Sequence, residues 1–189
     1  IPGRVQWLRI RSPKNRELLP QELLSAEDTE RMIAATQNNR DKALIATLWE
    51  TGMRVGELQS LRHKHVEFDD LGAHITIPQG KTGARRIRVI ACVPYLREIV
   101  NHETPEKPLF SNSHGKPLSH QAISKILKKT ARAAGIRKRV HPHLFRHSRA
   151  TFLAKHLTEA QLCEYMGWIP GSDMARVYVH LAGRDVDDA

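Results

Sequence analysis

The sequence predicts a mainly α domain with one small antiparallel β-sheet, an α+β fold. Helical periodicity and helix-capping residues recur along most of the chain, whereas apolar and polar residues alternate strictly in only two short segments. The chain has 189 residues, 40% of them hydrophobic, which is enough to bury one sizeable core. We find no internal repeat and no low-complexity tract.

Three helices are expected before the sheet. Ser25 and Asp28 have capping-box spacing, with Asp in place of the usual Glu or Gln. The pair Thr51-Gly52 marks the join between the second and third helices. The predicted ranges are about 25–38, 40–51 and 54–62.

A basic β-hairpin is expected next. Residues 74–77 and 86–90 alternate as half-buried strands do, and residues 78–83 between them are rich in turn formers. This pattern places Lys81 at the hairpin tip. A helix over about 94–102 and a proline-rich loop over 104–117 follow.

The segment 119–134 is the clearest helix in the sequence. At about 100° per residue its apolar side chains gather on one side. Four cations and no acid occupy the other side: Lys125, Lys128, Lys129 and Arg132. A merely solvated helix face usually mixes both signs of charge, so this face is predicted to contact phosphates.

Three further helices are predicted, over about 143–156, 158–166 and 171–180. The second of them opens on a capping box formed by Thr158 and Gln161.

The charge of the chain indicates a polyanionic partner. Thirty Lys and Arg against twenty Asp and Glu give a net charge of +10, with an isoelectric point near 10.0. A mean hydropathy of −0.47, with no apolar run of the roughly 20 residues that a spanning helix needs, argues against a membrane protein. Two cysteines cannot make a disulfide framework or a zinc finger. We therefore expect a cytoplasmic protein that binds a polyanion, with no membrane partner.

Three basic clusters could carry chemistry. Arg54 and Glu57 share a helix face, where they could hold a phosphate or form an ordinary ion pair within the helix. Lys81 could donate a proton, contact phosphate, or be a plain surface lysine. His143 and Arg146 project together toward one oxyanion.

His143 and His147 also have the spacing of a zinc-binding helix. No glutamate stands beside the first histidine, and Arg146 would repel a metal dication. The sequence therefore predicts no metal site here, and it favours structural roles for His141 and His147.

In chain order these residues, together with Trp168 and Tyr178, resemble the active-site set of the tyrosine recombinase/integrase family. That pattern is Arg, an acidic residue, Lys in a β-hairpin, His-x-x-Arg, His or Trp, and Tyr. Residues 51–58 look like the first box, and 143–147 look like the second, with Phe145 where Leu is commoner. Residues 166–168 look like the Leu-Gly-His segment.

The match runs from about Leu19 to His180, and its ending looks like archaeal or mobile-element members. Trp168 and Tyr178 are ten residues apart, one more than the commonest family spacing.

The resemblance implies the tyrosine recombinase catalytic-domain fold and a site-specific DNA recombinase or integrase. Such an enzyme cuts and rejoins double-stranded DNA through a 3′-phosphotyrosyl intermediate, without metal, ATP or another cofactor. The implied catalytic residues are Arg54, Lys81, His143, Arg146, Trp168 and Tyr178, with Glu57 in support.

The resemblance also implies a role for each residue. Tyr178 would attack the scissile phosphate, while Arg54 and Arg146 hold the non-bridging oxygens. Lys81 would protonate the leaving 5′ oxygen, and His143 would accept the Tyr178 proton. Trp168 would donate its indole N–H to a phosphate oxygen. Glu57 would orient Arg54 or His143.

Residues 1–20 are basic and interrupted by prolines, which fits either an interdomain linker or a solvated tail. Residues 21–189 form the predicted catalytic domain. Family members carry an N-terminal core-binding domain, to which nothing in this sequence corresponds. We expect a monomer when the chain is free, and self-association on DNA, where the family forms a tetrameric synapse.

Two other functions remain open at this stage. A type IB topoisomerase shares the chemistry but relaxes supercoils instead of exchanging strands. A non-catalytic DNA-binding protein could have the same fold, although it would not need Tyr178.

Overall fold

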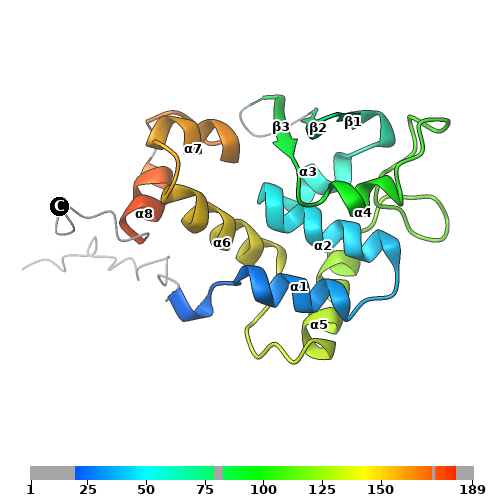
Figure 1. The fold of residues 1–189 in the computed structure, drawn as a ribbon, viewed down its shortest axis with the longest axis horizontal. Coiled ribbons are helices and arrows are strands. Elements are labelled where there is room, and N and C mark those ends of the chain that lie inside the picture. Colours follow the sequence, from blue (N-terminus) through cyan, green and yellow to red (C-terminus); the bar gives the residue numbers. More distant parts are fainter. Residues whose placement is uncertain (1–19, 79–82, 172, 182–189) are drawn as a thin grey trace, which may run out of the picture.

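The computed structural model describes residues 20–78, 83–171 and 173–181, and within them it confirms a mainly helical fold with one small antiparallel sheet (Figure 1). Lys81, nearly all of the basic lead-in and residues 182–189 lie outside the described residues.

The elements follow the order that the sequence predicts. The helices before the sheet are α1 (Ala26–Ala34), α2 (Asn39–Thr51) and α3 (Val55–Ser60), with short 3₁₀ helices at Pro20–Glu22 and His63–His65. The strands are β1 (Val66–Asp69), β2 (Gly72–Ile77) and β3 (Arg85–Val89). The later helices are α4 (Val93–Arg97), α5 (His120–Ala133), α6 (Pro142–Ala154), α7 (Glu159–Met166) and α8 (Asp173–Leu181).

The sheet has the order β1-β2-β3 and is antiparallel throughout. In its middle row, Ile75 of β2 lies between Val66 and Ile87, and all three side chains are buried. The sequence analysis missed β1, because four residues are too short to establish an alternating pattern. The sheet brings Arg85 opposite Ile77, at the base of the hairpin.

Helix α2 runs through the centre of the molecule in Figure 1 and packs against α1, α4 and α6. Its residues 43–48 are all buried. Near its end, the Glu50 carboxylate accepts the backbone N–H groups of Ile90, Ala91 and Cys92, at 2.7–3.1 Å. This carboxylate therefore joins α2 to the connection between β3 and α4.

A second apolar cluster lies among α6, α7 and α8 and includes Trp168 and Tyr178. Tyr165 packs against both clusters, and its hydroxyl donates to the Glu50 carbonyl at 2.7 Å. The three C-terminal helices are thereby fixed to the end of α2.

Helices α1 and α4 end four or more residues before their predicted limits. Helix α1 ends at Ala34 instead of continuing to residue 38, because Asn38 caps α2 by accepting the Asp41 N–H at 3.3 Å. Helix α4 ends at Arg97 instead of residue 102. Beyond it, the Asn101 N–H donates to the His63 ring at 3.3 Å, which draws the chain toward the 3₁₀ helix.

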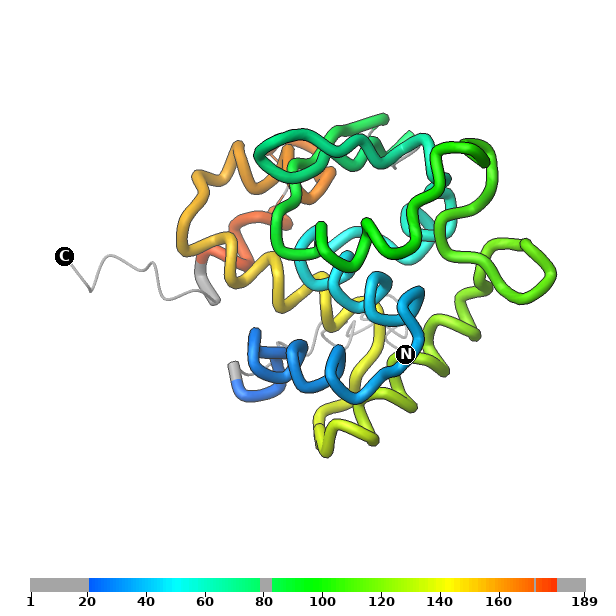
Figure 2. Tube along the Cα trace, turned by 45° about the vertical axis from the view of Figure 1, so that its right-hand side comes forward, coloured from blue at the N-terminus to red at the C-terminus, as the bar shows by residue number. Residues whose placement is uncertain are grey.

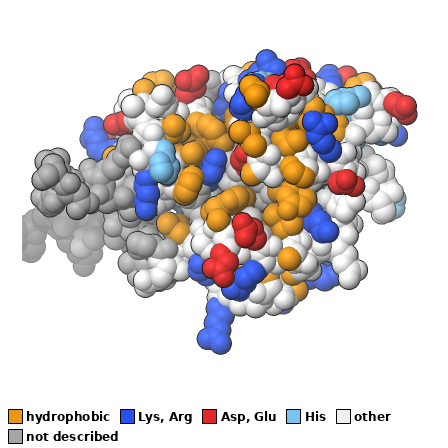
Figure 3. All heavy atoms as spheres, viewed as in Figure 1, with side chains coloured by type: hydrophobic (Ala, Val, Ile, Leu, Met, Phe, Trp, Pro, Cys, Tyr) orange, Lys and Arg blue, Asp and Glu red, His pale blue; other side chains and the backbone are white. Residues whose placement is uncertain are grey.

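In the views of Figures 1 and 2, α5 lies on the side of the molecule away from the sheet. The face in Figure 3 carries basic and acidic side chains interspersed, so charge of one sign does not dominate it. Within the described ranges, no helix is long and apolar enough to cross a membrane.

Candidate active site

Three arginine side chains donate hydrogen bonds to backbone carbonyls at the carboxyl end of α7. The carbonyls of residues 165, 166 and 167 accept, in that order, from Arg85 Nε at 3.2 Å, Arg146 Nη2 at 2.6 Å and Arg54 Nη2 at 3.2 Å. The last carbonyls of a helix lack partners within the helix and carry partial negative charge, so they attract cations. The turn thus brings together residues from β3, α6 and the start of α3.

Arg146 is buried, with 6% of its surface exposed. Its Nη1 donates to the Gly52 carbonyl at 2.9 Å, so two backbone carbonyls from different helices hold one guanidinium. Burial, followed by repulsion from Arg54, lowers the pKa of Arg146 to about 10. The two predicted phosphate-binding arginines lie close together, because they donate to the adjacent carbonyls of residues 167 and 166.

Arg54 caps α3 and pairs with Glu57. Glu57 accepts the Arg54 backbone N–H at 2.8 Å and its Nη1 at 3.0 Å, so the ordinary ion pair considered above is present. The same carboxylate also accepts hydrogen bonds from both terminal nitrogens of Arg85, each at 2.8 Å. Glu57 was expected to orient either Arg54 or His143, and of these two it binds Arg54. Its other partner is Arg85, which the sequence analysis did not single out.

Tyr178 lies on α8 with 4% of its surface exposed, and its ring stacks on Trp168 with centroids 5.1 Å apart. The Arg146 guanidinium lies 5.4 Å from the Trp168 ring centroid. Burial raises the pKa of Tyr178 to about 12, although the charge of Arg146 opposes this rise. A base must therefore remove the proton before this hydroxyl can act as a nucleophile near neutral pH.

The group at the Tyr178 hydroxyl is His147, whose Nδ1 shares a hydrogen bond of 2.5 Å with it. The sequence analysis assigned proton acceptance to His143, one turn earlier on α6 and exposed in the structure. Burial, followed by the charge of His143, lowers the pKa of His147. A neutral ring protonated at Nε2 accepts at Nδ1, so His147 can take the proton.

His147 could have been found from its place one turn after His143 and directly after Arg146. His141 caps α6 by accepting the Leu144 N–H at 3.3 Å, which is the structural role expected for it. Among the described residues, no group of three or more His, Cys, Asp or Glu side chains could hold a metal ion.

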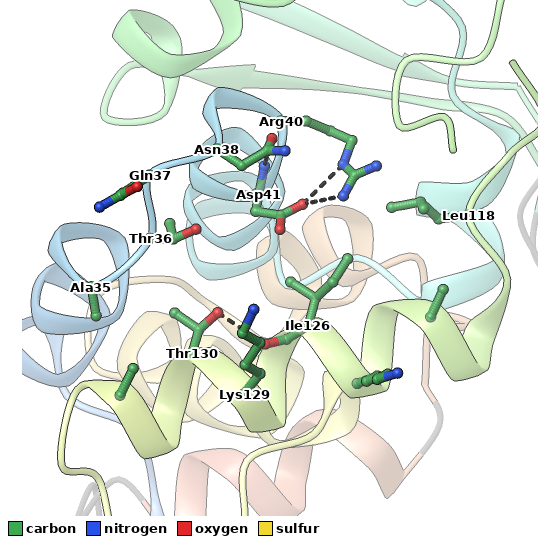
Figure 4. Close-up of a pocket in the computed structure, with 13 residues that line it drawn as sticks. Ala35, Thr36, Gln37, Asn38, Arg40, Asp41, Leu118, Ile126, Lys129 and Thr130 are labelled. Carbon is green, nitrogen blue, oxygen red and sulfur yellow. Dashed lines mark hydrogen bonds and ion pairs between the residues drawn. The ribbon is translucent and has the colours of Figure 1, made fainter. Parts of the chain in front are cut away.

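All four cations predicted to contact phosphates are exposed on α5. Lys125 and Lys129 also border a hollow of about 600 Å³ between α5 and the connection from α1 to α2 (Figure 4). None of the predicted catalytic residues that the structure describes lines this hollow. It therefore belongs to the surroundings of the basic helix, apart from the cluster around Tyr178.

Comparison with known proteins finds similarity along nearly all of the described region. Residues 22–184 match the model of the phage integrase family. The tyrosine recombinase XerD of Oceanobacillus iheyensis is 29% identical over 197 aligned residues, covering 96% of this chain and 64% of that protein.

Solved structures with a similar fold include the XerA recombinase, with a TM-score of 0.70 and 26% identity over 89% of this chain and 61% of that one. A lambda integrase tetramer bound to a Holliday junction has a TM-score of 0.64 at 19% identity, over 87% and 50% of the two chains. The present chain thus spans less than two thirds of the length of these relatives.

Gly167→Ala should destabilise the fold by disturbing the three arginines. Gly167 has a φ of +61°, and a Cβ there would lie 2.6 Å from Arg85 Nη1. Gly171→Ala is the matched control, because its φ is +76° but its Cβ would meet no described atom within 4 Å. Both variants should lose about 1–2 kcal/mol to backbone strain. Urea unfolding should show a clearly larger loss for Gly167→Ala, and equal losses would contradict the packing described here.

Proposed function

Because this chain belongs to the phage integrase family, we propose that it is the catalytic part of a tyrosine-type site-specific DNA recombinase. It would cut and rejoin DNA strands through a 3′-phosphotyrosyl intermediate, with residues 21–189 as the catalytic domain. The observation that carries this proposal is the Tyr178 hydroxyl, which is buried, hydrogen-bonded to a histidine and influenced by the charge of Arg146.

In the proposed cleavage step, Tyr178 Oη forms a bond to the scissile phosphorus as the bond from phosphorus to the 5′ oxygen breaks. His147 takes the phenolic proton, a role supported by its contact with the hydroxyl and by its lowered pKa. The exposed His143 is better placed to meet a phosphate oxygen. Lys81 would protonate the departing 5′ oxygen, and this role rests on the family pattern alone.

Arg54 and Arg146 would neutralise charge on the non-bridging oxygens, which is the main electrostatic demand of phosphoryl transfer. Their enclosure by backbone carbonyls supports this role, because guanidinium groups fixed in advance need little reorganisation as charge develops. Trp168 would form a wall of the site and donate its indole N–H to a phosphate oxygen.

The proposed reaction needs neither metal nor ATP. Arginine side chains supply the positive charge, and the phosphotyrosyl bond retains the energy of the phosphodiester for rejoining to a new 5′ hydroxyl. The substrate would be double-stranded DNA, which implies action in the cytoplasm at the nucleoid. By analogy with the lambda integrase tetramer on a Holliday junction, copies of this chain would associate on DNA. In the absence of DNA the chain would be a monomer.

Tyr178→Phe should abolish covalent attachment to DNA but leave DNA binding nearly unchanged, because one hydroxyl adds little to a charge-dominated interface. The assay uses a pool of nicked duplexes with randomised sequence around the nick, with EDTA present. Denaturing gels detect adducts, and mass spectrometry maps the attached residue. An adduct at Tyr165 or Tyr95 would contradict the assignment.

The same pool separates the alternative functions. If the unaltered chain binds DNA but forms no adduct, it is a DNA-binding protein without this activity. If an adduct forms, two copies of the captured duplex test strand exchange, and supercoiled plasmid tests relaxation. Exchange supports the recombinase, whereas relaxation without exchange identifies a topoisomerase.

The rate of adduct formation should fall on the acid side of neutrality. Protonated His147 cannot accept the Tyr178 proton, and because its pKa is lowered, the midpoint should lie below 6.5, the ordinary value for histidine. Rates at saturating DNA between about pH 5 and 8 measure this midpoint. His147→Asn should lower the rate and remove the acid limb, whereas His143→Asn should retain it. Retention of the limb in His147→Asn would exclude His147 as the base.

Neutralising Lys125, Lys128, Lys129 and Arg132 with Gln should weaken binding to all DNA sequences alike. Each lost phosphate contact should reduce the slope of log affinity against log salt by roughly 0.9. A variant that replaces only Lys125 and Lys128 should give about half of the change. Fluorescence anisotropy with two unrelated duplexes measures both slopes, and an unchanged slope would mean that these side chains face solvent.

A further inference from the structure

Arg85 is a buried cation that the proposed mechanism does not use. Its side chain is 10% exposed at the start of β3, and three of its N–H groups have partners. Nη1 and Nη2 bind the two oxygens of Glu57 at 2.8 Å each, and Nε donates to the Tyr165 carbonyl at 3.2 Å. The two-pronged pairing with a carboxylate sets the angle of both groups as well as their distance.

Glu57 stands between Arg85 and Arg54. Its two oxygens accept four hydrogen bonds, two from each arginine, which fills the capacity of a carboxylate. Burial raises the pKa of Glu57, but the hydrogen bonds from both arginines and the Arg85 charge outweigh it and hold that pKa below its usual range. Glu57 is therefore ionised, and it cannot turn toward one arginine without releasing the other.

Arg85 also supports the second group that holds Arg54. Its guanidinium occupies the space beside Gly167, where a Cβ would approach Nη1 to 2.6 Å. The Gly167 carbonyl is the acceptor for Arg54 Nη2. Arg85 thus contacts both partners of the Arg54 guanidinium, one on α3 and one at the end of α7.

The other two arginines of β3 lack this environment. Arg86 pairs with Glu67 at 2.6 Å and Arg88 with Asp69 at 2.8 Å, on the exposed side of the sheet. Their side chains are 53% and 38% exposed. Ion pairs of this kind contribute little, because water screens them. Arg88 lies on the same strand as Arg85, carries the same charge and also pairs with a carboxylate, so it is a suitable control.

We propose that Arg85 is a positioning residue that aims Arg54 at the scissile phosphate by fixing Glu57 and the Gly167 turn. This inference rests on the proposed function. Arg85 acts through its neighbours and does not itself touch DNA, since three of its five N–H groups are already bound within the protein and little of it is exposed.

The test compares Arg85→Met and Arg85→Lys with Arg88→Met. Each variant reacts with a nicked duplex captured by the unaltered chain, in single turnover and over a range of protein concentrations. Arg85→Met should slow adduct formation at saturation by about 10²-fold, the effect of a misplaced catalytic group. The protein concentration that gives half of the maximal rate should change little. Arg85→Lys keeps the charge but loses the two-pronged geometry. Its rate should therefore lie between that of Arg85→Met and that of the unaltered chain. Arg88→Met should match the unaltered chain.

A second substrate separates positioning of Arg54 from general loosening of the site. A methylphosphonate at the scissile position removes one negative charge from the non-bridging oxygens, which lessens the need for Arg54. On this duplex the defect of Arg85→Met should largely disappear. An equal defect on both substrates would overturn the proposal, and so would weakened DNA binding with an unchanged maximal rate. If Arg85→Met does not fold, as judged by thermal unfolding, Arg85→Lys carries the same comparison.

Failure of the inference can be told from failure of the proposed function. If the unaltered chain forms no adduct with any duplex of the pool, the proposed function is wrong. If it forms one and Arg85→Met reacts equally fast, only the positioning role of Arg85 is wrong.

Discussion

The arrangement around Tyr178 depends on the attraction between the carboxyl end of α7 and three guanidinium groups. Helix ends leave carbonyls without partners, and here residues 165–167 each receive an arginine from another part of the chain. The three cations repel one another, and after burial this repulsion from Arg54 and Arg85 also lowers the pKa of Arg146. The helix end and the carboxylate of Glu57 offset this repulsion. Trp168 follows the turn directly, so the same contacts also set the surface on which Tyr178 stacks.

Burial disfavours the charged forms of both Tyr178 and His147. Tyr178 is enclosed among α6, α7 and α8, where its phenol is harder to ionise than in water. The neighbouring His147 is harder to protonate for the same reason. A neutral base thus lies against a neutral acid, and the approach of a phosphate between fixed arginines would favour transfer of the proton. This arrangement needs α6, which carries Arg146 and His147 on consecutive residues.

The basic surface and the cluster around Tyr178 belong to different parts of the fold. Helix α5 bears four exposed cations beside the hollow in Figure 4, whereas the buried Arg146 and the partly buried Arg54 and Arg85 meet at the end of α7. Exposed lysines attract a polyanion of any sequence. Arginines held in a fixed orientation can instead form directed hydrogen bonds to a single phosphate group. Under the proposed function the two sets would serve binding and chemistry separately, a division that the net charge of +10 alone could not indicate.

Local patterns in the sequence were sufficient for the fold class, the position of α5 and the caps at Ser25 and Thr158, because they depend on neighbouring residues. The order of motifs also selected Tyr178 as the candidate nucleophile, and that role stays a prediction. Tertiary structure alone decided that His147 meets the Tyr178 hydroxyl, and that Arg85 shares Glu57 with Arg54. These partners come from separate elements. Their contact depends on how whole helices and strands pack, which no local spacing encodes.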